Sequence, residues 1–233
     1  MLIRLNMFLS LLFLIISQTV FSQANPWSFD INAGFSLHNF SNDRLIIANK
    51  YAIGTGLNAG LKVNYDLDSS RIFNLYEEIS FNGFTYSGEN NNYFSNVNII
   101  SFNLGLQYNI KNNSSFKPFV ILAITNNLFS GKTSPPITGI EEATLLPTSF
   151  RIGLQGGIGL NLQTSQSFGL NLGVNLNFAN IFLRSYINEY PYNSSYFTED
   201  NIYESGSSSN IKTISYFQFY TGISFYPGRK LNK

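Results

Sequence analysis

Apolar and polar residues alternate along most of this chain, and this alternation constrains the fold more than any other feature. From 168 to 178, every second residue is Phe, Leu or Val, and the residues between them are Gly or Asn. Similar stretches begin at Trp27, Leu57, Ile100 and Phe150. An extended strand places alternate residues on opposite faces, whereas a helix scatters them around its circumference. The pattern therefore predicts strands with one apolar and one polar face.

Three further segments fit the alternation less cleanly: 72–87, 118–129 and 211–226. Within 72–87 the phase changes at Glu77 and Glu78, which predicts a β-bulge there. The start of 118–129 is apolar at both parities, so its facing stays open. The sequence thus predicts eight strands in all. Several are longer than the five or six residues usual in globular proteins, and long enough to cross a bilayer, which takes about 9–11 tilted residues.

The connections between these strands alternate in length. Short ones lie near 68–70, 111–117 and 163–167, and long ones at 38–52, 88–98, 130–148 and 180–210. An even strand number with alternating short and long connections is typical of bacterial outer-membrane barrels. We therefore predict an all-β fold, an eight-stranded antiparallel transmembrane up-and-down β-barrel. Its short turns and both termini would face the periplasm.

The polar faces of the strands indicate which side meets lipid. Only 12% of the residues are charged, and the polar faces carry mainly Asn, Gly, Ser and Gln. A soluble barrel would place Lys and Glu on its water-facing side. We therefore expect the apolar faces to meet lipid, in a barrel closed so that no strand edge is left unpaired in hydrocarbon. A soluble lipocalin-like ligand carrier is the alternative.

The first residues have the features of an export signal. Arg4 precedes an apolar core at 7–16, and a small-residue pattern follows. This arrangement predicts a signal peptide over 1–22, cleaved near Ser22/Gln23, with cleavage after Ala24 as a variant. The apolar run is short for a membrane-spanning anchor. The barrel domain would occupy 23–233, in the bacterial outer membrane.

Four charged residues fall on the parity that faces the barrel interior: Asp30, Lys62, Glu78 and Arg151. An eight-stranded barrel is just wide enough to be filled by side chains, so a general diffusion pore is not expected. An unpaired charge inside would be costly. We therefore predict that these residues form a buried ionic plug, and we rank a proton or ion pathway below it.

Composition excludes several kinds of chemistry. The chain has no cysteine, one histidine and nearly equal numbers of basic and acidic residues, 14 and 13. We expect no metal, no cofactor and no nucleic-acid partner. A lipid-modifying enzyme is the alternative, because His38 has Ser36, Ser41 and Asp43 nearby in sequence. Sequence neighbours do not define a triad, however, and we favour a histidine at the rim of a non-enzymatic barrel.

The longest connection is rich in aromatic residues among scattered acidic ones. Tyrosine offers a large contact area at a low entropic cost, so this segment is a candidate recognition surface. A solvated or self-packed loop is the equal alternative. The residues concerned are Tyr186, Tyr190, Tyr192, Tyr196, Phe197 and Tyr203.

Three short motifs resemble those of the PorT-like outer-membrane β-barrel family, which consists of small porin-family barrels. They are LYEEISFNG at 75–83, Lys117-Pro118-Phe119, and NFANI at 177–181. The resemblance implies that Glu78 is the inward glutamate of the family's third strand, although the fourth strand lacks a proline common there. Together with the loops, it suggests a structural or binding protein in outer-membrane lipid. Such a protein would bind an extracellular ligand or belong to an envelope secretion or uptake complex. It would be a monomer in the first case and an accessory subunit in the second.

Overall fold

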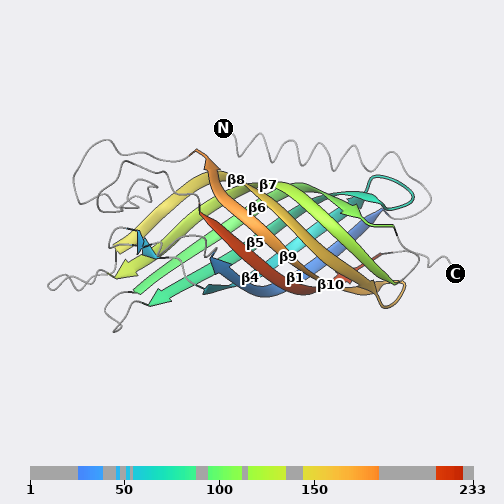
Figure 1. The fold of residues 1–233 in the computed structure, drawn as a ribbon, viewed down its shortest axis with the longest axis horizontal. Coiled ribbons are helices and arrows are strands. Elements are labelled where there is room, and N and C mark those ends of the chain that lie inside the picture. Colours follow the sequence, from blue (N-terminus) through green and yellow to red (C-terminus); the bar gives the residue numbers. More distant parts are fainter. Residues whose placement is uncertain are drawn as a thin grey trace.

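The computed structural model describes residues 26–38, 46–47, 51–52, 55–87, 94–111, 115–134, 144–183 and 214–227. Within them, eight antiparallel strands close into a barrel in the order β1-β10-β9-β8-β7-β6-β5-β4, with β4 paired back to β1 (Figure 1). The predicted fold class is confirmed. The barrel strands are β1 (Trp27–His38), β4 (Thr55–Asp66), β5 (Phe73–Ser87), β6 (Phe94–Asn109), β7 (Phe116–Ser134), β8 (Thr144–Gln163), β9 (Phe168–Phe182) and β10 (Ser215–Phe225).

A second, two-stranded pairing lies in the connection between β1 and β4. It joins β2 (Ile46–Ile47) to β3 (Tyr51–Ala52) and is separate from the barrel sheet.

No helix among the described residues is long and apolar enough to cross a membrane.

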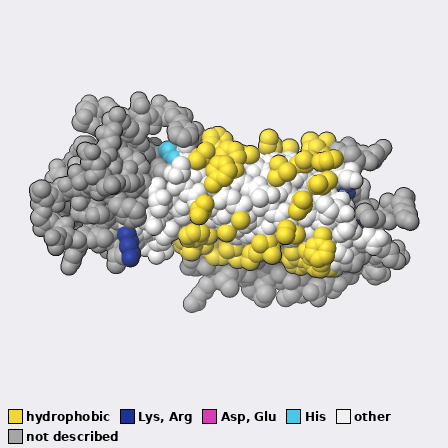
Figure 2. Space-filling view, turned by 90° about the horizontal axis from the view of Figure 1, so that it is seen from below, with side chains coloured by type: hydrophobic (Ala, Val, Ile, Leu, Met, Phe, Trp, Pro, Cys, Tyr) yellow, Lys and Arg dark blue, Asp and Glu magenta, His cyan; other side chains and the backbone are white. Residues whose placement is uncertain are grey.

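Burial in the barrel is reversed relative to a water-soluble protein. Leu57 on the outer wall is 74% exposed, whereas Gln155 in the lumen is fully buried. Figure 2 shows apolar side chains spread over the barrel wall between its two ends. Asparagine, serine and glutamine side chains fill much of the interior. This distribution places the apolar faces toward lipid, as the alternation predicts.

The predicted bulge in the third barrel strand is wrong. β5 pairs with β4 and with β6 in an unbroken register through Glu77 and Glu78. The alternation in sequence changes phase there without a bulge, because the inward positions include the aromatic Tyr76 and the outward positions include the acidic Glu77. Register shifts lie instead between Phe129 and Gly131 in β7 and between Ile152 and Leu154 in β8.

The structure also settles the facing of β7. Phe119 and Ile121 are buried in the lumen, while Val120 and Leu122 are exposed on the wall. Four strands extend further than predicted at the end with the long connections, since β6 begins at Phe94, β7 ends at Ser134, β8 begins at Thr144 and β9 ends at Phe182. The connections there are correspondingly shorter, at 88–93 and 135–143.

Interior glycines make room for large side chains from neighbouring strands. A Cβ atom at Gly159 would lie 2.2 Å from Cζ of Phe119 and 2.7 Å from the carbonyl oxygen of Leu172. Gly156, in the same strand, has no atom within 4 Å of the corresponding position. Small residues beneath large ones are how a narrow barrel reaches close packing.

We expect Gly159→Ala to lower the free energy of unfolding by about 1–3 kcal/mol, because Phe119 has to move. Gly156→Ala is the matched control and should be neutral or slightly stabilising, since alanine suits a strand better than glycine. Urea unfolding in detergent micelles measures both. Equal stability of the two variants would contradict this packing argument.

Candidate functional site

Three of the predicted interior charges form a row across adjacent strands. Asp30 in β1 pairs in register with Lys62 in β4, and Lys62 pairs with Glu78 in β5. All three are at least 93% buried. Because the strands are antiparallel neighbours in one sheet, residues opposite each other in register lie side by side on the same face. The fold therefore sets one cation between two anions inside the lumen.

The ammonium group of Lys62 lies among polar and aromatic groups. Its Nζ atom donates a hydrogen bond of 2.6 Å to Oε1 of Gln107. The same atom lies 4.5 Å from the ring centroid of Tyr76 and 5.3 Å from that of Phe119. An ammonium over an aromatic face is attracted by the ring quadrupole, more strongly when it is desolvated. The site thus compensates the buried cation with an amide and two rings as well as the flanking carboxylates.

Amide side chains satisfy the two carboxylates. Asn64 donates from Nδ2 to Oδ2 of Asp30 at 2.9 Å, and Asn103 donates from Nδ2 to Oε2 of Glu78 at 2.8 Å. Hydrogen bonds to a charged acceptor are stronger than neutral ones. The row and its amides form a connected polar layer across β1, β4, β5 and β6.

Arg151 is equally buried and faces the same lumen from β8. It lies in β8 opposite Asn127 of β7, outside the register row of Asp30, Lys62 and Glu78. Its Nη1 atom donates a 2.8 Å hydrogen bond to the carbonyl oxygen of Phe150. The register thus places three of the four predicted residues side by side, and a stabilising role for all four stays a prediction.

An apolar cluster fills the lumen at the end with the long connections, which sequence reasoning missed. Phe84 packs edge-on against Tyr216 with ring centroids 5.1 Å apart. Every member is at most 1% exposed, and the members come from β5, β6, β7, β9 and β10 and the residue before β10. The cluster consists of Phe84, Val97, Ile99, Phe129, Ala179, Ile214 and Tyr216.

The signal that could have revealed this apolar cluster is an inversion of the apolar parity within β6. Val97 and Ile99 point inward, whereas further along the strand it is the outward residues that are apolar, in an unbroken register.

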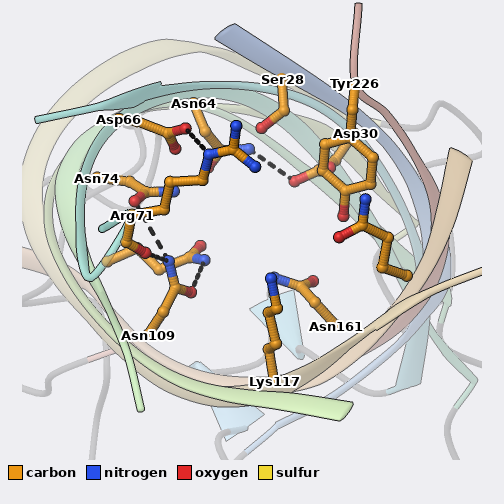
Figure 3. Close-up of a pocket in the computed structure, with 12 residues that line it drawn as sticks. Ser28, Asp30, Asn64, Asp66, Arg71, Asn74, Asn109, Lys117, Asn161 and Tyr226 are labelled. Atoms are coloured by element: carbon orange, nitrogen blue, oxygen red, sulfur yellow. Dashed lines mark hydrogen bonds and ion pairs between the residues drawn. The ribbon is translucent and has the colours of Figure 1, made fainter. Parts of the chain in front are cut away.

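The opposite end of the lumen opens as a polar cavity at the short turns (Figure 3). Arg71 reaches across it from the turn between β4 and β5, and its Nε atom lies 3.3 Å from Oδ2 of Asp66. Lys117 and Tyr226 also line the cavity.

Asp68 shapes the turn that carries Arg71. Its Oδ1 atom accepts hydrogen bonds from the backbone N–H groups of Ile72 and Phe73, at 3.0 and 2.9 Å. Slight burial acts in the opposite direction, but these bonds and one from the Ser70 hydroxyl lower the pKa of Asp68.

From the short turns to the long connections, the lumen thus has a polar mouth, then the charged row, and then an apolar cluster at the far end.

Ser36 and His38, the two candidate catalytic residues that the structure describes, do not form a catalytic pair. The Ser36 hydroxyl donates to Oδ1 of Asn82 at 2.8 Å and accepts from Nδ2 of Asn58 at 3.1 Å. His38 ends β1, and its Nε2 atom has no hydrogen-bond partner among the described residues. A nucleophilic serine needs a base within hydrogen-bonding reach. Ser41 and Asp43 lie outside the described residues, as do the predicted signal peptide and the six aromatic residues from Tyr186 to Tyr203.

The described part of the chain contains no group of three His, Cys, Asp or Glu side chains that could hold a metal ion.

A closed antiparallel barrel of eight strands, apolar outside and polar within, defines the class of small transmembrane β-barrels. The sequence supports the same class independently. Residues 8–206 match the sequence model of the family described as "Outer membrane protein beta-barrel domain", and the chain belongs to this family. Its place is therefore the bacterial outer membrane. The match stops before β10, the strand that closes the barrel in the structure.

Two solved structures share the fold. Neisserial surface protein A is 11% identical, with a TM-score of 0.55 over 88% of this chain and 99% of that chain. A major outer membrane protein of Thermus thermophilus is 13% identical, with a TM-score of 0.51 over 85% and 97%. A search of curated proteins found no significant match. The finer resemblance to the PorT-like family stays a prediction.

Proposed function

We propose that this protein is a non-conducting, non-enzymatic outer-membrane barrel that acts through binding. The observation that carries the proposal is the apolar cluster around Phe84 and Tyr216, because a lumen filled by packed side chains leaves no continuous water path. We further propose that the chain is exported with residues 1–22 removed and that its short turns face the periplasm. The long connections are then the parts presented outside.

Two roles follow for such a scaffold. The tyrosine-rich segment 184–213 supports binding of an extracellular ligand, because rigid aromatic side chains suit recognition. The motifs resembling the PorT-like family, such as Lys117-Pro118-Phe119, support an accessory role in an envelope secretion or uptake complex. In both roles the barrel is an anchor, and the connections or its rims make the contacts.

Capture in mild detergent tests this proposal. The tagged full-length protein is compared with a variant in which Tyr190, Tyr192 and Tyr196 are replaced by serine. We expect the wild type to retain a specific partner and the variant to lose it, while both keep the heat-modifiable gel migration of a folded barrel. Identical partners for the two proteins would contradict binding through this segment.

The closed lumen gives a second expected result. Purified protein inserted into a planar lipid bilayer should give no stable conductance steps, because the apolar cluster excludes water and ions. A porin of the same class, inserted in parallel, controls for the membrane. Sustained, reproducible steps from this protein would show that the lumen conducts, and the non-conducting proposal would be wrong.

A further inference from the structure

Glu77 places a carboxylate on the outer wall of the barrel. Its strand neighbours Tyr76 and Glu78 are 1% and 6% exposed and face the lumen. Alternate residues of a strand face opposite sides, so Glu77 faces outward with Ile79, which is 53% exposed. In register, Glu77 lies between Val63 of β4 and Leu104 of β6. The carboxylate therefore emerges from an apolar part of the wall.

This carboxylate has no protein partner in the described part of the chain. The Glu77 side chain forms neither a hydrogen bond nor an ion pair there. The other charged strand residues either face inward, as Lys62 and Arg151 do, or lie near the long connections, as Lys132 does. Charged residues at membrane depth are rare and expensive, and they mark functional sites by default.

The depth of Glu77 in the wall places it nearer to the membrane leaflet at the short turns. Phe73, at the short-turn end of β5, contacts Tyr108 with ring centroids 5.2 Å apart. Aromatic pairs of this kind form the girdle at a membrane interface. Glu77 lies four residues further along, which is about 13 Å of strand and, with the usual tilt, about 10 Å above the girdle. The lipid headgroups nearest to Glu77 are thus those of the leaflet at the short turns.

We propose that Glu77 binds the primary ammonium group of a phospholipid in this leaflet. An ammonium offers the opposite charge and three hydrogen-bond donors. The large aliphatic side chains around it, including Leu75 and Leu104, suit acyl chains. A second copy offers no outward cation at this depth among the described residues. The proposal rests on the proposed orientation, in which this leaflet is the periplasmic one.

The test compares unfolding of the full-length protein in vesicles of two compositions. One is phosphatidylcholine, whose quaternary ammonium cannot donate a hydrogen bond. The other is an equimolar mixture of phosphatidylcholine and phosphatidylethanolamine with the same acyl chains. Because both leaflets carry the same lipids, the direction of insertion does not matter. The proteins are wild type, Glu77→Gln, and Ile79→Gln as a control on the same face of β5.

We expect phosphatidylethanolamine to raise the folded-to-unfolded ratio of the wild type about five-fold more than that of Glu77→Gln. Ile79→Gln should keep the full wild-type response, because it retains the carboxylate. Equal responses of wild type and Glu77→Gln would overturn the proposal.

A basic residue of another membrane protein is the competing occupant of this site. A photocrosslinker at position 79 that captured a polypeptide in whole cells, with no lipid response in vesicles, would assign the site to such a partner and overturn the proposal. Heat-modifiable migration is read on the same samples. Loss of this migration in every sample would show that the protein does not form a stable barrel. Failure of the proposed binding function would appear only in the capture of partners in mild detergent.

Discussion

Replacing Glu78 by alanine should lower the free energy of unfolding in detergent by about 1–3 kcal/mol, the range for leaving a buried hydrogen-bonding group without its partner. The substitution leaves Lys62 buried with Asp30 as its remaining register neighbour of opposite charge. It also removes the acceptor that Oε2 provides for Nδ2 of Asn103. An unsatisfied buried donor carries a further desolvation cost. Heat-modifiability gels and urea titration both measure the loss.

Two variants separate charge from shape at this position. Glu78→Gln keeps an acceptor oxygen for Asn103, so it should lose less stability than Glu78→Ala. Combining Lys62→Met with Glu78→Gln leaves Asp30 as the one buried charge of the row and should lose more stability than Glu78→Gln alone. Lys132→Ala, an exposed substitution, should change stability by less than about 0.5 kcal/mol. Wild-type stability of Glu78→Ala would reject the charged plug.

The outer architecture could be predicted because it rests on alternation and connection length. In β9 the inward positions are Asn, Gly or Ala from Gly169 to Ala179 and the outward ones are large and apolar, so the two faces separate cleanly. Parity also indicates that Asp30, Lys62 and Glu78 face inward. It does not say which residues are neighbours. That follows from register, which the short turn around Asp68 fixes between β4 and β5.

The rule that apolar residues face lipid fails where the lumen itself is apolar. Near the long connections, Phe84 and Phe129 point inward because the lumen there is packed with apolar side chains. Glu77 breaks the same rule in the other direction. An acidic residue at an outward position looks in sequence like a change of phase, and only the unbroken pairing of β5 with both neighbours excludes a bulge. Contacts between strands determine which way these residues face, and the pattern within a single strand does not contain that information.

Phe84→Ala should cost about 3–5 kcal/mol of stability, because it leaves a cavity that the surroundings cannot fill. The ring of Phe84 contacts Tyr216, and its Cδ1 atom would lie 3.0 Å from a Cβ atom at Gly56. Gly56 has no side chain with which to occupy the space. Phe81→Ala is the matched control, since Phe81 lies in the same strand but is 44% exposed on the wall. Acyl chains can take the place of its ring, so the loss should be smaller.

The same cluster should control passage through the lumen. Removing Phe84 and Phe129 together takes away the two phenylalanines of the cluster, while the polar mouth near Arg71 stays unchanged. A dry apolar constriction blocks ions because water does not wet it, and widening it lets water enter. We therefore expect the Phe84→Ala/Phe129→Ala variant to show conductance in planar bilayers where the wild type shows none. A folded double variant that stays silent would mean that the apolar cluster is not what closes the lumen.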